Sequence, residues 1–213
     1  IVQGATGNTT AKITSQHQLI YSKIKQQMSA ELAKQYAEAN ETAIRLIKEI
    51  VDEHSIECDW TPQSAYIFTQ RDGYVQKLID EAHIATDLGI KASFTEQLDL
   101  PFSTKGGLCY EEQAQFHPRK YLLSLAEKIP GNDCHIFERS RVVDIDDDSV
   151  YLVKTVEGHK VKAEKLVVAT HYPIYNKLAG LYAARIYPDR SYVVAIKAKE
   201  PYPDGMYITA EEP

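Results

Sequence analysis

The spacing of apolar residues changes near residue 134, and this change limits the chain to a fold that mixes helices with antiparallel strands. Between residues 29 and 51 apolar side chains recur three and four positions apart, which lines one face of an α-helix. These positions are Leu32, Tyr36, Ala39, Ala43, Ile47, Ile50 and Val51. Beyond residue 134 apolar and polar side chains alternate, as in half-buried strands. The sequence therefore predicts an α+β fold with its strands divided between two sheets.

Further helices and strands are predicted in the first 130 residues. The expected helices span 15–28, 72–88 and 118–129, and the expected strands span 65–69 and 108–115. Gly89 suits the position after a helix, Pro118 suits a first helical turn, and Ser29 is a candidate N-cap of the long helix. Residues 1–15 are rich in Gly and Thr, which are poor helix formers, so a loop is expected there.

The last third of the chain is expected to consist mainly of strands. They span 134–137, 141–145, 150–154, 160–163, 165–170, 192–199 and 206–209. The three strands between residues 141 and 163 are separated by short polar turns, so an antiparallel meander is predicted. Residues 165–170 are almost continuously apolar, which is typical of a strand buried on both faces.

Composition narrows the possible partners. The 24 basic and 30 acidic residues give a net charge of −6. Binding to the phosphates of a nucleic acid usually needs an excess of basic residues, so no nucleic-acid partner is expected. No apolar run approaches the about 20 residues needed to cross a bilayer, and no membrane partner is expected. Three cysteines cannot form a complete disulfide framework, which favours a reducing compartment, the cytoplasm. The seven histidines lack metal-ligand spacing, so no metal site is expected.

The opening run Gly4–Ile13 is the best candidate for binding a cofactor. Its small residues let backbone N–H groups and Thr hydroxyls approach phosphate or ring oxygens closely. A phosphate-binding P-loop would need Gly-Lys-Ser/Thr, whereas Gly7 is followed by Asn8 and Thr9. The alternative is a flexible polar segment without a ligand.

These elements and motifs resemble the D-amino-acid-oxidase-like family of FAD-dependent enzymes, which includes glycine and sarcosine oxidases. Gly4–Ile13 resembles the second FAD-contacting loop of that family, Val142–Ile145 resembles a strand whose backbone meets the adenine, and Val167–His171 resembles a Val-Val-Ala-Thr-Gly strand with His171 in place of glycine. The runs Tyr21–Lys23, His117–Tyr121 and Tyr187–Tyr192 are similar to a bacterial subgroup that carries a C-terminal Rieske [2Fe–2S] domain.

Two hallmarks of such enzymes are missing from these 213 residues. There is no G-x-G-x-x-G turn, which normally binds the pyrophosphate, and no C-x-H…C-x-x-H pattern of a Rieske cluster. We therefore expect the chain, which begins at Ile1 and ends at Pro213, to be an interior piece of a longer enzyme. Any [2Fe–2S] cluster is expected in a C-terminal domain that this chain does not include.

The resemblance implies a fragment of an FAD-linked reductase fold: a substrate-binding antiparallel sheet with helices, and part of an FAD-binding α/β domain that includes the meander. The partial FAD-binding domain would comprise 1–58 and 116–175, and the substrate-binding region 59–115 and 176–213. The implied FAD contacts are Gly4, Thr6, Gly7, Asn8, Thr9, Thr10, Ala11, Lys12, Ile13, Thr14, His17, Val143, Ala169, Thr170 and His171. Lys12, Thr14 and His17 would lie near the flavin ring, where a cation stabilises the reduced ring.

Tyrosine is unusually abundant, with 14 residues against 5 phenylalanines. Its apolar face and hydroxyl suit a pocket for a polar organic amine. The candidate substrate-binding residues are Tyr66, Tyr110, Tyr192 and Tyr207, with Arg190 as a carboxylate clamp. The alternative places these tyrosines at strand edges and on the surface.

An acidic run, Asp144–Asp148, raises the question of calcium. An EF-hand loop requires a Gly and a later Glu at fixed positions, and neither pattern is met. A polar hairpin turn is predicted instead.

These observations lead to one principal functional hypothesis and two alternatives. The principal one is an FAD-dependent oxidoreductase that oxidises a small amine or amino acid at the carbon next to nitrogen, with electrons passing to a Rieske domain. The first alternative is a non-catalytic domain that binds a small ligand or a partner. An NAD-linked dehydrogenase is the second, and it too would need a nucleotide-binding βαβ unit. The catalytic base and the oligomeric state are left open.

Overall fold

A computed structural model describes residues 1–174 and 183–211, and the chain divides into two compact units. The first unit comprises Ile1–Lys128 and Ile196–Pro213, and the second comprises Ile129–Ala195. These two units are defined by contacts between residues. The division predicted from the sequence, into an FAD-binding domain and a substrate-binding region, is defined by binding roles and stays a prediction.

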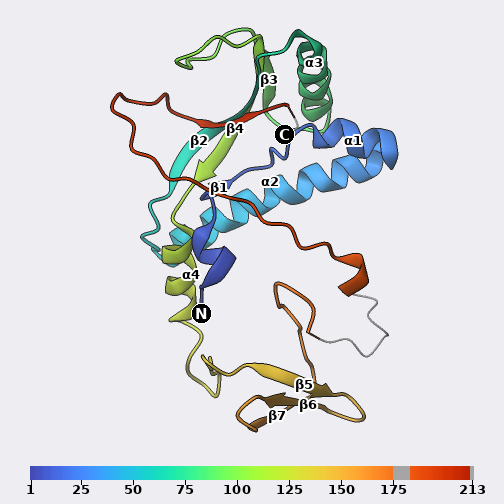
Figure 1. Ribbon diagram of the computed structural model, residues 1–213, viewed down its shortest axis with the longest axis vertical. Coiled ribbons are helices and arrows are strands. Elements are labelled where there is room, and N and C mark those ends of the chain that lie inside the picture. Colours follow the sequence, from blue (N-terminus) through green and yellow to red (C-terminus); the bar gives the residue numbers. More distant parts are fainter. Residues whose placement is uncertain (175–182, 212–213) are drawn as a thin grey trace. The chain divides into compact units, whose positions relative to one another are not determined.

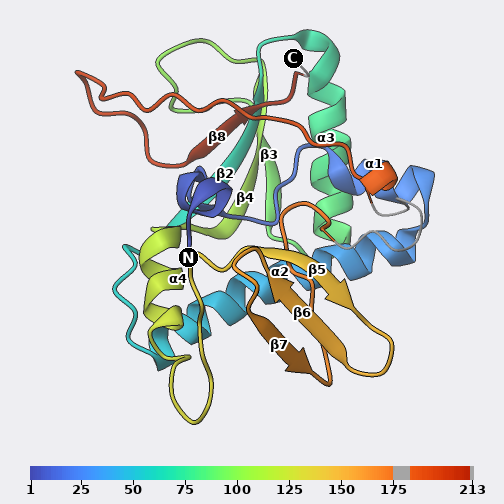
Figure 2. The same cartoon turned by 60° about the horizontal axis from the view of Figure 1, so that its bottom comes forward.

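A five-stranded sheet forms the centre of the first unit (Figure 1). Its strands are β1 (Lys12–Ile13), β2 (Thr61–Thr69), β3 (Ala92–Thr95), β4 (Gly106–Gln115) and β8 (Met206–Thr209). The order is β1-β4-β2-β8, and β3 also pairs with β4. All pairs are antiparallel except β2 with β8, which run parallel side by side (Figure 2). The predicted strands over 65–69, 108–115 and 206–209 are thus confirmed, whereas β1 and β3 were not foreseen.

Four α-helices belong to the same unit. They are α1 (Ile20–Gln27), α2 (Ala30–Glu53), α3 (Asp72–Asp87) and α4 (Pro118–Ala126). Ser29 caps α2 as predicted, because its hydroxyl oxygen accepts the Leu32 N–H at 3.1 Å. Gly89 follows α3 with a φ of +88°, the left-handed conformation that glycine adopts without strain. The first helix begins at Ile20 and not at residue 15 as expected.

One face of the sheet packs against α3 and forms the core. Alternation along β2 directs Ala65 and Ile67 to this face, where both are almost fully buried. They join Leu78 of α3 and Leu108 of β4 in one hydrophobic cluster. Tyr66, between the two core residues of β2, is directed to the opposite face of the sheet.

A buried carboxylate joins α3 to the start of α1. Glu81 is completely buried, and its two oxygens accept the backbone N–H groups of Tyr21 and Ser22, each at 2.8 Å. The Ser22 hydroxyl donates to the same carboxylate. Burial raises the pKa of Glu81, and the bonds from Ser22 and Tyr21 oppose that rise. The first-turn N–H groups of a helix favour such a negative partner.

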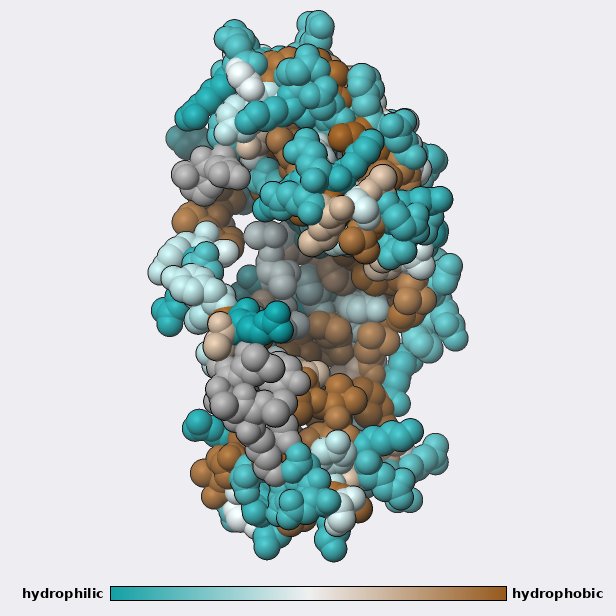
Figure 3. Space-filling view, turned by 90° about the vertical axis from the view of Figure 1, so that its right-hand side faces the viewer, coloured by the Kyte–Doolittle hydropathy of each residue, from teal (hydrophilic) through white to brown (hydrophobic). Residues whose placement is uncertain are grey.

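The second unit contains the predicted three-stranded meander. β5 (Val142–Asp146), β6 (Tyr151–Thr155) and β7 (Lys160–Ala163) pair antiparallel in sequence order. Hydrophilic residues cover much of this sheet in the space-filling view (bottom of Figure 3). A short 3-10 helix, η2 (Ala183–Arg185), follows later in the unit.

Three predicted strands are wrong. Residues 134–137, 165–170 and 192–199 form no strand, apart from a single bridge between Gly131 and Cys134. Val167 is 85% exposed, which contradicts the expected burial on both faces. A strand needs a neighbouring strand for its backbone hydrogen bonds, and within 1–174 and 183–211 none pairs with these segments.

The helices of the described ranges include none with the length and apolar character required to cross a bilayer.

Candidate functional site

The predicted cofactor loop forms a short 3-10 helix, η1 (Gly4–Asn8), in place of an irregular loop. The side-chain amide of Asn8 donates to the Gly4 carbonyl at 2.7 Å, and the Ala11 N–H donates to the Thr9 hydroxyl oxygen at 3.1 Å. Gly4 and Ala11 both adopt left-handed φ angles, +66° and +63°. Short side chains and local hydrogen bonds therefore hold a tight backbone turn here.

Part of this loop lines a pocket of about 470 Å³, which we call the loop pocket. Its lining residues are Gly7, Thr9, Ala11, Asp59, Thr61, Gln115, Phe116, His117, Pro118 and Arg119. Three predicted FAD contacts, Gly7, Thr9 and Ala11, thus share one cavity. A Cβ atom on Gly7 would lie 3.0 Å from the Val2 carbonyl oxygen, so a side chain there would disturb the loop.

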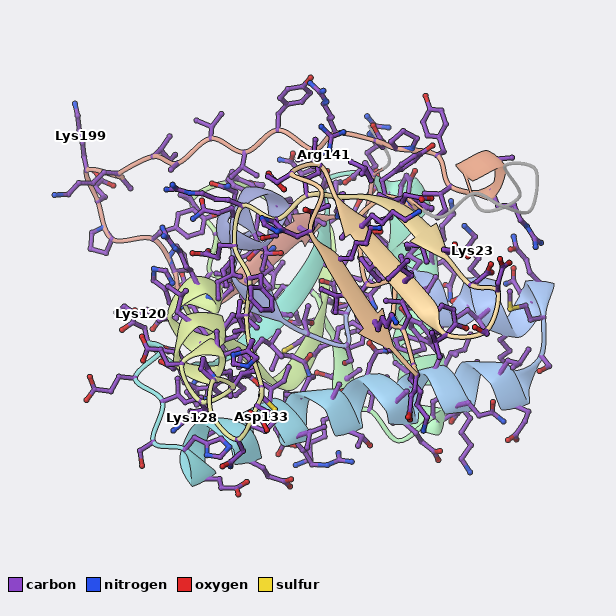
Figure 4. The ribbon with its side chains drawn as sticks, turned by 90° about the horizontal axis from the view of Figure 1, so that it is seen from below. Lys23, Lys120, Lys128, Asp133, Arg141 and Lys199 are labelled. Carbon is purple, nitrogen blue, oxygen red and sulfur yellow. The ribbon has the colours of Figure 1, made fainter. Side chains whose placement is uncertain are left out.

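The start of α4 forms the opposite part of the lining. His117 is the N-cap, and its Nδ1 accepts the Lys120 N–H at 3.3 Å. The ammonium of Lys120, which projects from α4 in Figure 4, binds the Asp59 carboxylate at 2.7 Å and lowers its pKa. The positive end of a helix dipole and the Arg119 guanidinium suit an anionic or hydrogen-bond-accepting group.

The residues after the loop continue into buried structure. Ile13 is buried on β1 and pairs with Ala114, and the Ser15 N–H donates to the buried Gln113 side chain at 2.7 Å. The Thr14 hydroxyl accepts the Gln16 N–H at 2.9 Å. These bonds fix the backbone between the loop and α1 and explain why the helix starts late.

Two titratable predicted contacts lie in this segment. Lys12 is exposed overall, yet partial burial of its ammonium lowers its pKa. Nδ1 of His17 lies 2.8 Å from the Tyr36 hydroxyl of α2, and burial lowers the pKa of His17 as well. Both shifts favour the neutral form of the side chain.

One residue of this segment was missed from the sequence. Gln16 is 7% exposed, and its side-chain Nε2 has no hydrogen-bond partner among the described residues. A buried amide nitrogen without a partner is uncommon and marks a place where a ligand can accept a hydrogen bond. In the sequence, the only indication of a role for Gln16 was its position between Thr14 and His17, which are both predicted FAD contacts.

A second cavity, of about 450 Å³, opens on the sheet face opposite the core, and we call it the tyrosine pocket. It is lined by Tyr66, Thr95, Gln97, Leu98, Asp99, Cys109, Pro203, Asp204 and Tyr207. Tyr66 and Tyr207 occupy paired positions on β2 and β8, and their rings stack with centroids 4.8 Å apart and planes 10° apart. Two of the predicted substrate residues are thereby brought together.

Tyr110 lies on the other side of the sheet. It is fully buried in the core, with its ring centroid 6.4 Å from that of Tyr21. Its hydroxyl has no partner among the described residues, and burial raises its pKa. Tyr110 and Tyr66 could not be told apart from the sequence alone, since the sheet register decides which face each side chain occupies.

Of the remaining predicted residues, Thr6 lies in η1 and Thr10 lies between η1 and β1, and both are exposed. The others belong to the second unit, and the binding roles of all of them stay predictions. Val143 lies on β5 and is 56% exposed. The other residues lie in exposed segments without regular structure and are Ala169, Thr170, His171, Arg190 and Tyr192. The Thr170 hydroxyl donates to the Tyr172 carbonyl at 2.7 Å.

The end of the acidic run, Asp147 and Asp148, lies in the turn between β5 and β6 as predicted, while Asp144–Asp146 belong to β5. Oxygens of Asp146, Asp147 and Asp148 lie within 4.8 Å of one another. The Asp148 N–H approaches the Asp146 carboxylate at 3.4 Å. Such clusters of carboxylates are ordinary on exposed turns.

Comparison with known proteins relates the whole chain to flavoenzymes. Residues 1–211 match the sequence model of a family described as DAO, FAD-dependent oxidoreductase. A curated relative from Bacillus subtilis (strain 168), named as a Rieske 2Fe-2S iron-sulfur protein, YhfW, is 41% identical over 186 residues. The match covers 87% of this chain and 36% of that protein, so the chain spans about a third of the relative's length.

Solved structures show the same fold at low identity. Glycine oxidase from Geobacillus kaustophilus has a TM-score of 0.60 and 16% identity, over 85% of this chain and 49% of that one. L-Proline dehydrogenase from P. horikoshii has a TM-score of 0.54 and 15% identity, over 68% and 40% of the two chains. The expected α+β fold is thereby confirmed.

Proposed function

The chain belongs to the DAO family of FAD-dependent oxidoreductases, and we propose that its protein oxidises a small amine or amino acid at the carbon bonded to nitrogen. The observation that carries this proposal is the pairing of two cavities in one unit. The loop pocket is lined by residues of the predicted cofactor loop and lies where β2 begins and β4 ends, and the tyrosine pocket opens on one face of the same sheet. An enzyme of this kind needs both a cofactor site and a concave site for substrate.

The donor set around the loop pocket fits a flavin nucleotide. Gly7, Thr9 and Ala11 offer backbone and hydroxyl groups, and Arg119 in the first turn of α4 offers its backbone N–H and its guanidinium. The unpartnered Nε2 of the buried Gln16 is a further donor in the same segment of chain. When bound, FAD supplies the oxidant that accepts the hydride equivalent removed from the substrate carbon.

The residues of the chain would bind, orient and shield the substrate. Tyr66 and Tyr207 present apolar ring surface, while burial raises the pKa of Tyr207 to about 12, so its hydroxyl stays protonated at neutral pH. Asp99 and Asp204 add acceptors for a substrate N–H group. We assign no catalytic base.

We also propose that electrons leave through a [2Fe–2S] domain outside residues 1–213. The name of the Bacillus subtilis relative, a Rieske 2Fe-2S iron-sulfur protein, supports this proposal. The cysteines and histidines of this chain do not fit a Rieske cluster, because their spacing lacks the required pairs. The three free cysteines, Cys58, Cys109 and Cys134, support a reducing, cytoplasmic location.

Flavin content tests the proposal. We expect the purified protein to show the absorption bands of oxidised flavin, and these bands to bleach when an oxidisable amine or amino acid is added without oxygen. Gly7→Val should lose at least tenfold in flavin affinity, because its side chain would press on the Val2 carbonyl beside the loop pocket.

Gly73→Ala is the matched control. A Cβ atom at Gly73, in the first turn of α3, would meet nothing within 4 Å, so this variant should keep its flavin. Absence of flavin from the wild-type protein, or equal flavin affinity in both variants, would contradict the assignment of the loop pocket. Circular dichroism of each variant separates loss of flavin from loss of fold.

A further inference from the structure

The tyrosine pocket has an aromatic lining that is built by residues distant in the sequence. A row of paired positions crosses the sheet from Cys109 on β4 through Tyr66 on β2 to Tyr207 on β8. The ring of Tyr202 meets that of Tyr207 edge to face, with centroids 6.1 Å apart and planes 81° apart. Three tyrosine rings therefore gather at this end of the sheet.

The charged residues that line the tyrosine pocket are acidic. Asp99 and Asp204 line the pocket, and none of its lining residues is Lys, Arg or His. Glu111 also acts on Tyr66 as a nearby negative charge. Burial, followed by Tyr66, Tyr202 and Asp99, raises the pKa of Tyr207.

The backbone holds the rings in place. The Tyr207 hydroxyl donates to the Asp204 carbonyl at 2.9 Å, which ties the ring to the loop before β8. Gly205, with a φ of +130°, passes so close that a Cβ atom there would lie 2.9 Å from a ring carbon of both Tyr66 and Tyr207. The aromatic wall is thus set by the chain itself before any ligand arrives.

We propose that the tyrosine pocket binds an organic ammonium ion, held by the tyrosine rings and by the carboxylates of Asp99 and Asp204. Ring faces and edges carry opposite partial charges, and cations bind to aromatic faces, most tightly in dry surroundings. Two carboxylates in a lining that contains no basic residue favour the same charge and oppose a ligand carboxylate. Binding of this ion does not depend on the proposed function. The further step, that the ion is the substrate, rests on the proposed function, and the pocket would then favour an amine without a carboxylate over an amino acid.

Choline and its neutral carbon isostere, 3,3-dimethyl-1-butanol, test the proposal. The two molecules have nearly the same shape and differ in charge, and acetate serves as the anionic probe. Binding to the purified protein is followed by ligand-observed NMR, while flavin is measured separately by absorbance. We expect choline to bind at least fivefold more tightly than the isostere, acetate not to bind, and salt to weaken the binding of choline.

Substitutions locate the binding. Asp204→Asn should weaken choline binding about fivefold, and Asp87→Asn, which removes an equal charge from the exposed end of α3, should leave it unchanged. Tyr207→Leu removes the stacked ring and should abolish measurable binding. Tyr207→Phe keeps the ring and should retain most of it, which separates loss of the ring from loss of fold.

Three results would overturn the proposal. They are the absence of choline binding, equal affinity for the neutral isostere, and preference for acetate. None of them depends on flavin, so a protein that holds flavin but fails this test keeps the proposed function and loses only the ammonium site. A protein that binds choline as expected but holds no flavin keeps the ammonium site and loses the proposed function.

Discussion

At the scale of single residues, Gly205 limits the geometry of the tyrosine pocket. A Cβ atom at this position would approach ring carbons of Tyr66 and Tyr207 to 2.9 Å, and its φ of +130° is unfavourable for other residues. Either effect alone destabilises the folded state. The two effects can be separated, because Gly131 has nearly the same φ, +132°, with nothing within 4 Å of its Cβ position.

We therefore expect Gly205→Ala to lower the free energy of unfolding by about 2–4 kcal/mol, and Gly131→Ala by about 1–2 kcal/mol. The difference reports the contact with the two rings. Urea unfolding followed by circular dichroism measures both values. Equal losses would mean that the rings move aside without strain.

The chemistry at residue scale could be predicted only in part. The composition and spacing of Gly4–Ala11 indicated a loop able to approach a ligand, and three of its residues line one cavity. Tyr66 and Tyr110 were indistinguishable, because their burial depends on which face of the sheet each occupies. Gln16 was missed because a side-chain amide becomes unusual only when its burial and lack of a partner are known.

At the scale of helices and strands, Glu81 couples α3 to α1. Gln in its place keeps one acceptor oxygen but presents an NH₂ group to one of the two backbone N–H groups, of Tyr21 and Ser22, that the carboxylate accepts. We expect Glu81→Gln to lose about 1–3 kcal/mol of stability, as for other buried groups left without a partner. Asp80→Asn, an exposed neighbour on α3, should stay within about 0.5 kcal/mol.

The difference in stability between the wild-type protein and Glu81→Gln should change with pH in one direction. Burial raises the folded-state pKa of Glu81 above its ordinary 4.5, so between these two values the folded protein holds more protons than the unfolded chain. Stability therefore falls as pH rises through this window, and the wild-type margin over Glu81→Gln should shrink. Unfolding measured at several pH values tests this, and a margin that grows with pH would show that the bonds to α1 dominate over burial.

Elements with local signals were predictable, and those that depend on distant partners were not. The period of α2 and its Ser29 cap lie within a few residues of each other, and the helix forms as expected. Residues 165–170 carry a strong strand pattern, but a strand also needs a neighbour, which no local pattern supplies. The short strands β1 and β3 show the reverse, since pairing with β4 extends segments whose own sequences gave little signal.

At the scale of the whole molecule, the second unit interrupts the sequence of the first. Residues 129–195 intervene between α4 and the segment that contains β8, and β8 then pairs with β2 in parallel. Met206 and Ala210 are 4% and 5% exposed, and both belong to the main core cluster. The C-terminal strand is therefore part of the first unit and not an appendage.

A cut in the exposed segment before β8 should consequently leave the strand in place. We expect a protease site inserted after Lys199, which is labelled in Figure 4, to be cleaved readily while the piece from residue 200 onward co-elutes with residues 1–199 in gel filtration. Met206→Asp, which buries a charge in the core, should release it. Separation of the unmodified cut pieces would mean that β8 adds little to the stability of the sheet.

The pairing of Tyr66 with Tyr207 also has a consequence for biosynthesis. About 140 residues separate the two rings in the sequence, so a ribosome must complete the whole of this stretch before the aromatic wall can close. A nascent chain that stops early would leave β2 with an unpaired edge and half of its ligand site. Capture of a ligand there would thus report that synthesis has passed residue 207.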